Sequence, residues 1–229
     1  MILYIIRHGE PNYEKDCLTE FGKKQAEAVG RRLAKAGVER VFSSPMGRAK
    51  ETAAPLCRML GLEYGIEEWA REIGREKTTT FPDGVPKSIA MVQNTYYLAE
   101  GAYDLGYSRA FECRGICESE MKTAVDRIER CGDEFLERLG YRKEDGIYRV
   151  VRPNEERVAL FCHAALGRAW LSVLLRVPLN IMWASFSYEL TGVTTLEFRN
   201  NDNGLTAPRC ISFSDTSHLY AEGLDSYFI

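Results

Sequence analysis

This sequence has no long hydrophobic run. Its first six residues are apolar, but they stop at Arg7 and lack the basic start and the small-residue cleavage site of a signal peptide. Elsewhere, charged residues recur too often for the ~20 consecutive apolar residues of a membrane span. We therefore expect a soluble, cytoplasmic protein without a membrane partner.

An excess of positive charge is also absent. The 30 Lys and Arg residues are balanced by 33 Asp and Glu residues, so the net charge at pH 7 is −3. Proteins that bind duplex nucleic acid usually carry a basic excess, and we expect no nucleic-acid partner. Any anionic ligand has to be bound by a local group of cations.

The seven cysteines form no CxxC pair, and several lie within apolar segments. This pattern is typical of buried, reduced thiols in the cytosol and not of a disulfide framework. With 229 residues, of which 45% are hydrophobic and 28% charged, the chain can bury a core without covalent links. No repeat or linker divides it, so we predict a single domain over residues 1–229.

Short apolar runs alternate with amphipathic helical patterns along most of the chain. The runs at 1–6 and 158–162 are typical of strands that are covered on both faces in a parallel sheet, and residues 41–43 are predicted to form a short strand. We therefore predict an α/β fold, a three-layer α/β/α sandwich whose mostly parallel central sheet has the first strand near its middle. Helices are predicted over 20–35, with Thr19 as N-cap and Gly37 as the stop, between Pro45 and Gly61, over 118–139, and from 166 to before Pro178.

Two other segments have distinct patterns. Residues 193–198 and 209–213 flank a turn rich in Asn, Asp and Gly, which predicts a late hairpin. Between about residues 75 and 115 the helical periodicity stops, and we interpret this stretch as an ordered insertion after the second helix. Its tyrosines, together with Phe81 and Phe111, either cap a binding site or form a separate small core.

Arginines and histidines follow three of the predicted strands directly. Ligands of open α/β sheets bind beyond the carboxyl ends of the strands. Arg7-His8-Gly9 follows the first strand, the segment 43–48 with Arg48 follows the second, and His163 follows the strand at 158–162. Arginine side chains and helix N-termini favour a phosphoryl group, and a neutral imidazole beside that group can attack phosphorus. The sequence therefore predicts a phosphate site at this edge of the sheet.

These residues resemble the motifs of the histidine phosphatase superfamily, which includes cofactor-dependent phosphoglycerate mutases and broad-specificity phosphatases. Residues 5–10 (IIRHGE) resemble the RHG signature, residues 18–26 (LTEFGKKQA) the LTxxGxxQA segment, and residues 43–53 (SSPMGRAKETA) the SSPxxRAxxTA segment. Phe161-Cys162-His163 resembles the late histidine at a strand end. Agreement of several motifs in order and spacing is specific. It covers about the first 75 residues well and the chain from about 158 more loosely, and it implies a phosphoglycerate mutase-like fold.

The resemblance also implies a mechanism without metal or cofactor. His8 would attack phosphorus and form a phosphohistidine, which water then hydrolyses, while Arg7, Arg48 and His163 would bind the phosphoryl oxygens. An acid after the second helix would protonate the leaving group. Glu72 is our candidate for this acid, and its competitors lie in the same acidic stretch: Glu67, Glu68 and Glu76.

Some positions depart from the family pattern. Ala164 and Ala165 follow His163 where glycine is common, and a methyl group there can crowd the phosphate site, although the backbone N–H donors remain. Glu14 stands where many members have asparagine. The tryptophan-rich segment of the mutases is absent, which favours a phosphoric monoester hydrolase acting on small phosphorylated metabolites. The alternatives are a phosphoglycerate mutase-type phosphotransferase and a weakly catalytic phosphate-binding or regulatory protein.

The remaining candidates are weaker. His218 is either a third base in the site or a structural histidine, and a lone late histidine is more often structural. A zinc site built from His8, His163 and Cys162 is disfavoured because neighbouring side chains of a strand point to opposite faces and the spacing fits no zinc motif. We expect Cys162 to pack in the core, and nothing indicates an oligomeric state. Four arginines could extend the positive surface: Arg109, Arg114, Arg149 and Arg152.

Overall fold

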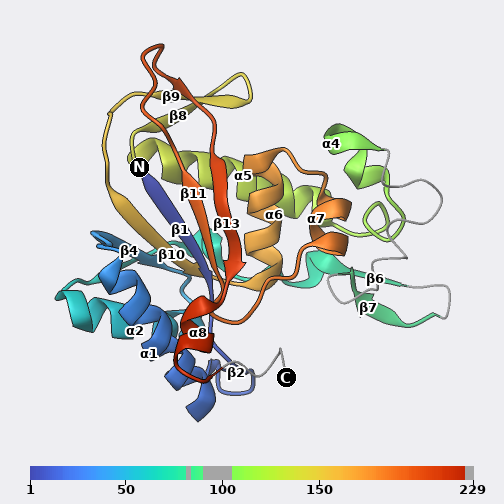
Figure 1. Cartoon of the computed structure of the whole chain (residues 1–229). Helices are drawn as coiled ribbons and strands as arrows, with labels where there is room; N and C mark the ends of the chain where they lie inside the picture. The colour runs from blue at the N-terminus through green and yellow to red at the C-terminus, as the bar shows by residue number, and fades with distance from the viewer. Residues whose placement is uncertain (81–83, 90–104, 225–229) are drawn as a thin grey trace.

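The computed structural model describes residues 1–80, 84–89 and 105–224, and its centre is a six-stranded sheet in the order β13-β11-β1-β10-β4-β5 (Figure 1). Strands β1, β10, β4 and β5 are parallel, and β11 is antiparallel to both of its neighbours. The predicted mostly parallel sheet with an interior first strand is confirmed. The strands are β1 (Ile2–Arg7), β4 (Arg40–Ser43), β5 (Tyr64–Ile66), β10 (Arg157–Cys162), β11 (Val193–Glu197) and β13 (Arg209–Asp215).

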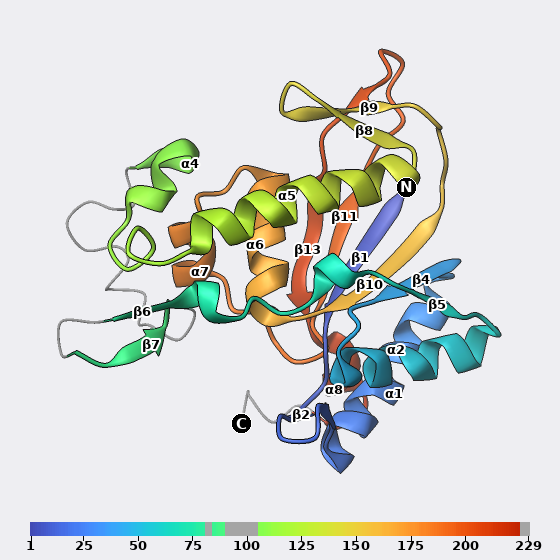
Figure 2. The same ribbon diagram turned by 180° about the vertical axis from the view of Figure 1, so that it is seen from behind.

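Helices cover both faces of the sheet and form the three layers that the sequence predicts. α1 (Glu20–Lys35) and α2 (Gly47–Leu60) pack on one face, and α5 (Met121–Arg138) and α6 (Ala164–Leu175) on the other. Figure 2 shows α5 lying across the sheet on the side opposite to α1 and α2. In β1, Ile5 belongs to the core under α5 and α6, Ile6 belongs to the core under α1 and α2, and both are fully buried.

Local sequence signals account for the ends of α1 and α2. Thr19 Oγ1 accepts a hydrogen bond from the N–H of Gly22 at 3.0 Å, which caps α1 at its predicted first residue. Gly37 and Gly61 follow the two helices with φ of 73° and 65°, the left-handed conformation that glycine adopts without strain. The two helices cross closely, because a Cβ on Gly30 would lie 3.2 Å from Cβ of Pro55.

Smaller elements surround this framework. Their bounds are β2 (Pro11–Asn12), β3 (Cys17–Leu18), η1 (Glu68–Ala70), η2 (Arg75–Lys77), β6 (Thr78–Thr80), β7 (Pro86–Ser88), α4 (Gly106–Arg109), η5 (Ala110–Glu112), β8 (Tyr141–Glu144), β9 (Ile147–Val150), α7 (Leu179–Ser185), β12 (Leu205–Thr206) and α8 (Ser217–Ala221). Within the described part of the chain, no helix is long and apolar enough to cross a membrane.

Within the segment interpreted as an insertion, the structure describes residues 75–80, 84–89 and 105–115. Phe111 packs against the core under α5 and α6, and the guanidinium of Arg176 lies 4.2 Å from the ring centroid of Tyr107. These two aromatic residues therefore pack within the fold. The other aromatics singled out by the sequence lie outside the described residues: Phe81, Tyr96, Tyr97 and Tyr103.

A small sheet in the order β12-β9-β8 was not predicted from the sequence. Strands β11 and β13 pair as the predicted antiparallel hairpin, but the chain between them first adds β12 to β9. This sheet lies at the amino end of β1, where the N-terminal amine donates to Tyr141 Oη at 3.2 Å. Arg149 and Arg152 are therefore far from the carboxyl end of β1, and they pair with Glu144 and Glu156.

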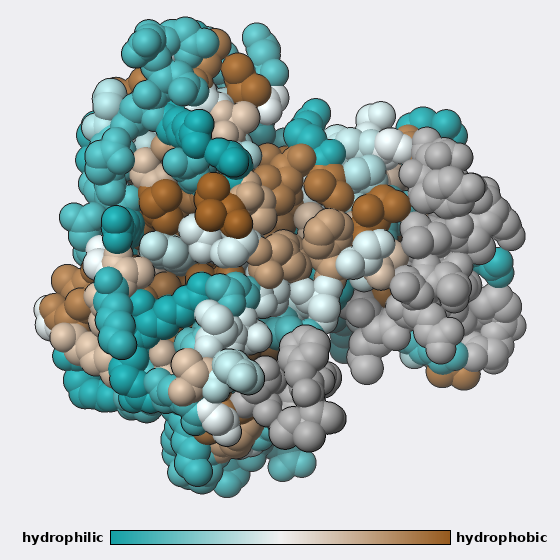
Figure 3. Space-filling view, in the orientation of Figure 1, coloured by the Kyte–Doolittle hydropathy of each residue, from teal (hydrophilic) through white to brown (hydrophobic). Residues whose placement is uncertain are grey.

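The face seen in Figure 3 is mainly hydrophilic at its rim, with hydrophobic residues gathered across its middle over β13 and α6. β13 is one of the two outer strands of the sheet, and its Ile211 is 53% exposed. This open edge is less polar than the rim around it.

Candidate active site

His8 lies directly after β1 and is buried, with 2% of its surface exposed. Its Nδ1 is 2.7 Å from the carbonyl oxygen of Gly9. Since a carbonyl oxygen can only accept, Nδ1 carries the proton and Nε2 of the neutral ring has a free lone pair. Burial lowers the pKa of His8 to about 3, helped by the positive charges of Arg7 and Arg48. The imidazole is therefore neutral near pH 7.

The loop that carries His8 is held by side chains from the other two motifs. Thr52 Oγ1 accepts a hydrogen bond from the N–H of Gly9 at 3.0 Å and donates to the carbonyl of Arg48 at 2.7 Å. Gln25 Oε1 accepts from the N–H of Glu10 at 2.8 Å. Thr52 and Gln25 are both buried, so these bonds satisfy main-chain groups that water does not reach.

Two glycines allow this loop to touch the start of α1. A Cβ on Gly22 would lie 2.2 Å from the carbonyl oxygen of Glu10, and one on Gly9 would lie 2.8 Å from the carbonyl oxygen of Gly22. No side chain fits at such distances. The glycines of the RHG and LTxxG segments are therefore required by the close approach of two backbones.

Arg7 and Arg48 bring two guanidinium groups to the same place. Arg7 Nη1 donates to the carbonyl oxygen of Tyr188, and Arg48 Nη1 donates to Asp16 Oδ1 at 2.5 Å. The Nε atoms of both arginines are buried and have no partner among the described residues. A buried N–H group without an acceptor is costly, and both of these groups are available to donate to a ligand.

His163 follows β10 and is fully buried beside His8, with the ring centroids 5.2 Å apart. Its Nε2 lies 2.8 Å from Ser44 Oγ, which accepts a hydrogen bond from the N–H of Met46. Its Nδ1 is buried and has no hydrogen-bond partner within the described part of the chain. Burial, His8 and Arg48 lower the pKa of His163 well below its usual value.

Glu72 reaches the same group of residues through the start of α6. Its Oε1 accepts hydrogen bonds from the N–H groups of Ile73 and Leu166, at 2.9 and 3.0 Å, and its Oε2 accepts from Ala165 at 3.3 Å. Lys77 Nζ lies 4.0 Å from Oε2. The N–H groups of Ala165 and Leu166 are therefore bonded to Glu72.

The three competing acids lie elsewhere. Glu67 is buried and bonds to Trp69 Nε1 and to Arg138. Glu68 pairs with Arg71 on the surface, and Glu76 pairs with Arg127. Of the four carboxylates that the sequence left open, the one whose described contacts reach the helix after His163 is that of Glu72.

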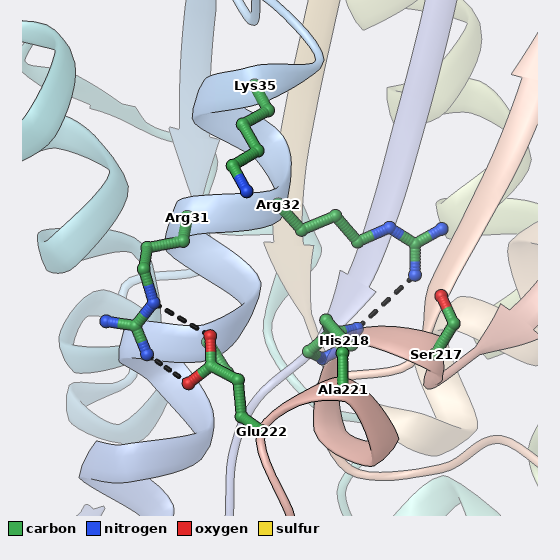
Figure 4. Close-up of a pocket in the computed structure, with 8 residues that line it drawn as sticks. Arg31, Arg32, Lys35, Ser217, His218, Ala221 and Glu222 are labelled. Carbon is green, nitrogen blue, oxygen red and sulfur yellow. Dashed lines mark hydrogen bonds and ion pairs between the residues drawn. The ribbon is translucent and has the colours of Figure 1, made fainter.

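His218 is outside this group of residues. Its Nε2 is 3.0 Å from Thr191 Oγ1, its Nδ1 is 3.3 Å from Nη1 of Arg32, and burial lowers its pKa to about 4. It borders a cavity of about 460 Å³ between α1 and α8, where Arg31 pairs with Glu222 (Figure 4). The hydrogen bonds of His218 thus join α8 to α1 and to the loop before β11.

Two further expectations concern thiols and metals. Cys162 is fully buried in the core, as predicted, and burial raises the pKa of its thiol. Among the residues that the structure describes, no three His, Cys, Asp or Glu side chains form a group that could hold a metal ion.

Parts of this chain are similar to known proteins. Residues 3–82 match the histidine phosphatase superfamily (branch 1). The fructose-2,6-bisphosphatase TIGAR of Xenopus laevis is 42% identical over 150 residues, which are 60% of this chain and 49% of that protein. A putative phosphoserine phosphatase 2 of Hydrogenobacter thermophilus is 32% identical over 80 residues, 31% of this chain and 39% of that protein. The chain thus aligns with about half the length, or less, of these relatives.

Solved structures share the fold over nearly the whole chain. Phosphoserine phosphatase of Entamoeba histolytica, in complex with 3-phosphoglyceric acid, has a TM-score of 0.62 at 21% identity and covers 95% of this chain and 98% of its own. A mycobacterial glucosyl-3-phosphoglycerate phosphatase has a TM-score of 0.60 at 22% identity and covers 93% and 98%. At these identities the similarity shows that the chain has the same fold as these proteins. The similarity to the histidine phosphatase superfamily is carried by residues 3–82 of this chain.

Proposed function

We propose that this protein is a metal-independent phosphatase that hydrolyses phosphomonoesters of small metabolites through a phosphohistidine on His8. One observation carries the proposal. Three buried nitrogen atoms around His8 have no acceptor or donor among the described residues: Nε of Arg7, Nε of Arg48 and Nδ1 of His163. A phosphoryl group has oxygens for all three, and cationic donors bind it more strongly than neutral ones.

In the first step of the proposed reaction, the Nε2 lone pair of His8 attacks phosphorus and the ester P–O bond breaks. The burial that keeps His8 neutral also leaves Nε2 unprotonated for this attack. Arg7, Arg48 and His163 stabilise the charge on the phosphoryl oxygens as it develops. The departing alkoxide takes a proton from Glu72.

Oε2 is the oxygen of Glu72 that we assign to this proton. Oε1 already accepts two main-chain hydrogen bonds, whereas Oε2 accepts a longer one from Ala165 and so keeps a lone pair for a proton. In the second step the Glu72 carboxylate takes a proton from a water molecule, which attacks the phosphohistidine. Cleavage of the P–N bond releases phosphate and restores neutral His8.

The test is hydrolysis of p-nitrophenyl phosphate with EDTA present by the wild type, by His8→Ala and by His218→Gln. His218→Gln is the matched control, because it replaces a buried histidine whose described side-chain contacts are with Thr191 and Arg32. We expect turnover in the wild type and in the control and none in His8→Ala, and acid-labile phosphate bound to protein after a rapid quench of the wild type. Activity that survives His8→Ala contradicts the mechanism.

The products distinguish the two alternative functions. Release of inorganic phosphate supports hydrolysis, whereas transfer between hydroxyls of one phosphoglycerate or sugar phosphate would identify a mutase-type phosphotransferase. A weakly catalytic binding protein would bind inorganic phosphate in calorimetry and show no turnover of any phosphoester in a metabolite panel.

A further inference from the structure

Asp16 bonds to the start of α2 and to the side chain of Arg48 at once. It lies between β2 and β3 with φ of 48°, a left-handed conformation that aspartate tolerates better than most residues. Its Oδ2 accepts a hydrogen bond from the N–H of Gly47 at 2.7 Å, and its Oδ1 accepts from Arg48 Nη1 at 2.5 Å. The Asp16 carboxylate therefore links the main chain of Gly47, the first residue of α2, to the guanidinium of Arg48, the second residue of that helix.

The other described contacts of this guanidinium are weak. Arg48 Nη2 lies 3.5 Å from Sδ of Met46, and a thioether is a poor acceptor. The ring of Tyr13 lies 5.4 Å from Arg48 Cζ, but Tyr13 is 68% exposed. The Arg48 side chain is 6% exposed and that of Asp16 is 42% exposed. The orientation of a buried cation is thus set mainly by one partly exposed carboxylate.

The turn that carries Asp16 is itself held against α2. A Cβ on Gly47 would lie 2.0 Å from the carbonyl oxygen of Asp16, so the two backbones are in contact. The N–H of Leu18 donates to Glu51 Oε2, on α2, at 2.7 Å. Burial opposes ionisation of Asp16, but the hydrogen bonds from Gly47 and Arg48 outweigh it and hold its pKa below the usual value. At neutral pH the turn presents a fixed, charged acceptor.

We propose that Asp16 is a positioning residue that directs the guanidinium of Arg48 at the phosphoryl group. The inference rests on the proposed function, in which Arg48 binds that group. By accepting from Nη1, Asp16 leaves Nε, which has no partner among the described residues, to the ligand. A guanidinium that is already oriented loses less freedom when the ligand binds, so its contribution to affinity is larger.

Positioning and simple charge repulsion predict opposite effects on phosphate affinity. A carboxylate beside the site repels an anion, so removing its charge should tighten phosphate binding if Asp16 acts through space. If Asp16 acts by holding Arg48, the same change should weaken phosphate binding. Asp16→Asn separates the two cases, because asparagine keeps the shape and one acceptor oxygen but removes the charge.

The experiment measures the dissociation constant of inorganic phosphate by calorimetry, and the melting temperature, in five proteins: wild type, Asp16→Asn, Glu51→Gln, Arg48→Lys and Asp16→Asn with Arg48→Lys. We expect Asp16→Asn to weaken phosphate binding about tenfold, since small misplacements of a binding group are costly. Glu51→Gln alters the anchor of the same turn without touching Arg48 and should stay within about twofold. In the Arg48→Lys background, Asp16→Asn should add little.

The inference is overturned if Asp16→Asn binds phosphate as tightly as the wild type or more tightly, if Glu51→Gln weakens binding equally, or if the loss is the same with and without Arg48. If Asp16→Asn does not fold, Asp16→Ser, which keeps an acceptor for Gly47, is measured in the same cycle. An unchanged phosphate affinity in Arg48→Lys overturns the phosphate site, and with it both the proposed function and this inference. If phosphate affinity falls in Arg48→Lys but not in Asp16→Asn, the proposed function stands and only the role of Asp16 is overturned.

Discussion

The carboxyl group of Glu72 accepts a hydrogen bond from the N–H of Leu166 at 3.0 Å, and the two residues are 94 positions apart in the chain. This bond ties the segment after η1 to the first turn of α6. Because His163 directly precedes α6, the same contact holds the carboxyl group close to that histidine.

Replacing Glu72 by Gln should slow poor leaving groups far more than good ones. An alkyl phosphate needs a proton on its departing oxygen, so we expect kcat/KM to fall by about 10²-fold or more, whereas hydrolysis of p-nitrophenyl phosphate should fall much less. The matched control is Glu76→Gln, because Glu76 pairs with Arg127 away from the site. Equal slowing of both substrates in Glu72→Gln would assign the proton to another group.

Acid should destabilise the fold before the carboxylates titrate. The pKa of His8 is about 3 and that of His218 about 4 in the folded protein, both below the ordinary 6.5 because of burial. Below pH 6.5 the unfolded chain therefore binds more protons than the folded one, and the free energy of unfolding falls with pH by up to about 1.4 kcal/mol per pH unit for each such histidine. Above pH 6.5 these histidines are neutral in both the folded and the unfolded state, so they no longer lower the free energy of unfolding.

Urea unfolding at pH 7, 6 and 5 measures this dependence. His218→Gln should remove the contribution of His218 to the pH dependence of the free energy of unfolding and leave that of His8 unchanged. A free energy of unfolding that does not change between pH 7 and 5 would show that these side chains protonate alike in the folded and unfolded states.

Adding a methyl group at Gly22 should damage both the fold and the site. The Cβ of Gly22→Ala would lie 2.2 Å from the carbonyl oxygen of Glu10, so α1 and the loop that carries His8 have to separate. We expect a loss of about 1–3 kcal/mol in the free energy of unfolding and a marked loss of phosphatase activity. Lys24→Ala, an exposed position in the same helix, is the control and should retain both. A fully stable and active Gly22→Ala would contradict the close approach.

Thr52 offers a pair of variants that separate the hydroxyl from the shape of the side chain. Thr52→Val keeps the volume but leaves the buried N–H of Gly9 without its acceptor, which should lower the free energy of unfolding by about 1–3 kcal/mol. Activity should fall with it, because Gly9 adjoins His8. Thr52→Ser keeps the hydroxyl and should restore most of both properties. If Val and Ser behave alike in thermal unfolding and turnover, the hydrogen bond is unimportant.

Local patterns predicted most of the framework. The cap at Thr19, the glycine stops and the apolar runs located α1, α2 and the central strands, because helix ends and burial on two faces depend on residues close in sequence. The small sheet of β8, β9 and β12 was missed. β12 has two residues, and it is paired by a partner strand far along the chain, so no local periodicity marks it.

For the candidate site, the residue types and their places at strand ends followed from the sequence: Arg7, His8, Arg48 and His163 each adjoin a strand or the helix after it. Tertiary structure alone distinguished Glu72 from Glu67, Glu68 and Glu76, since all four lie in one acidic stretch and only packing brings one of them to α6. Only the tertiary structure shows the hydrogen bond between the side chains of Asp16 and Arg48, which are 32 residues apart in the chain. Hydrogen bonds between distant segments depend on how strands and helices pack, which spacing along the chain does not encode.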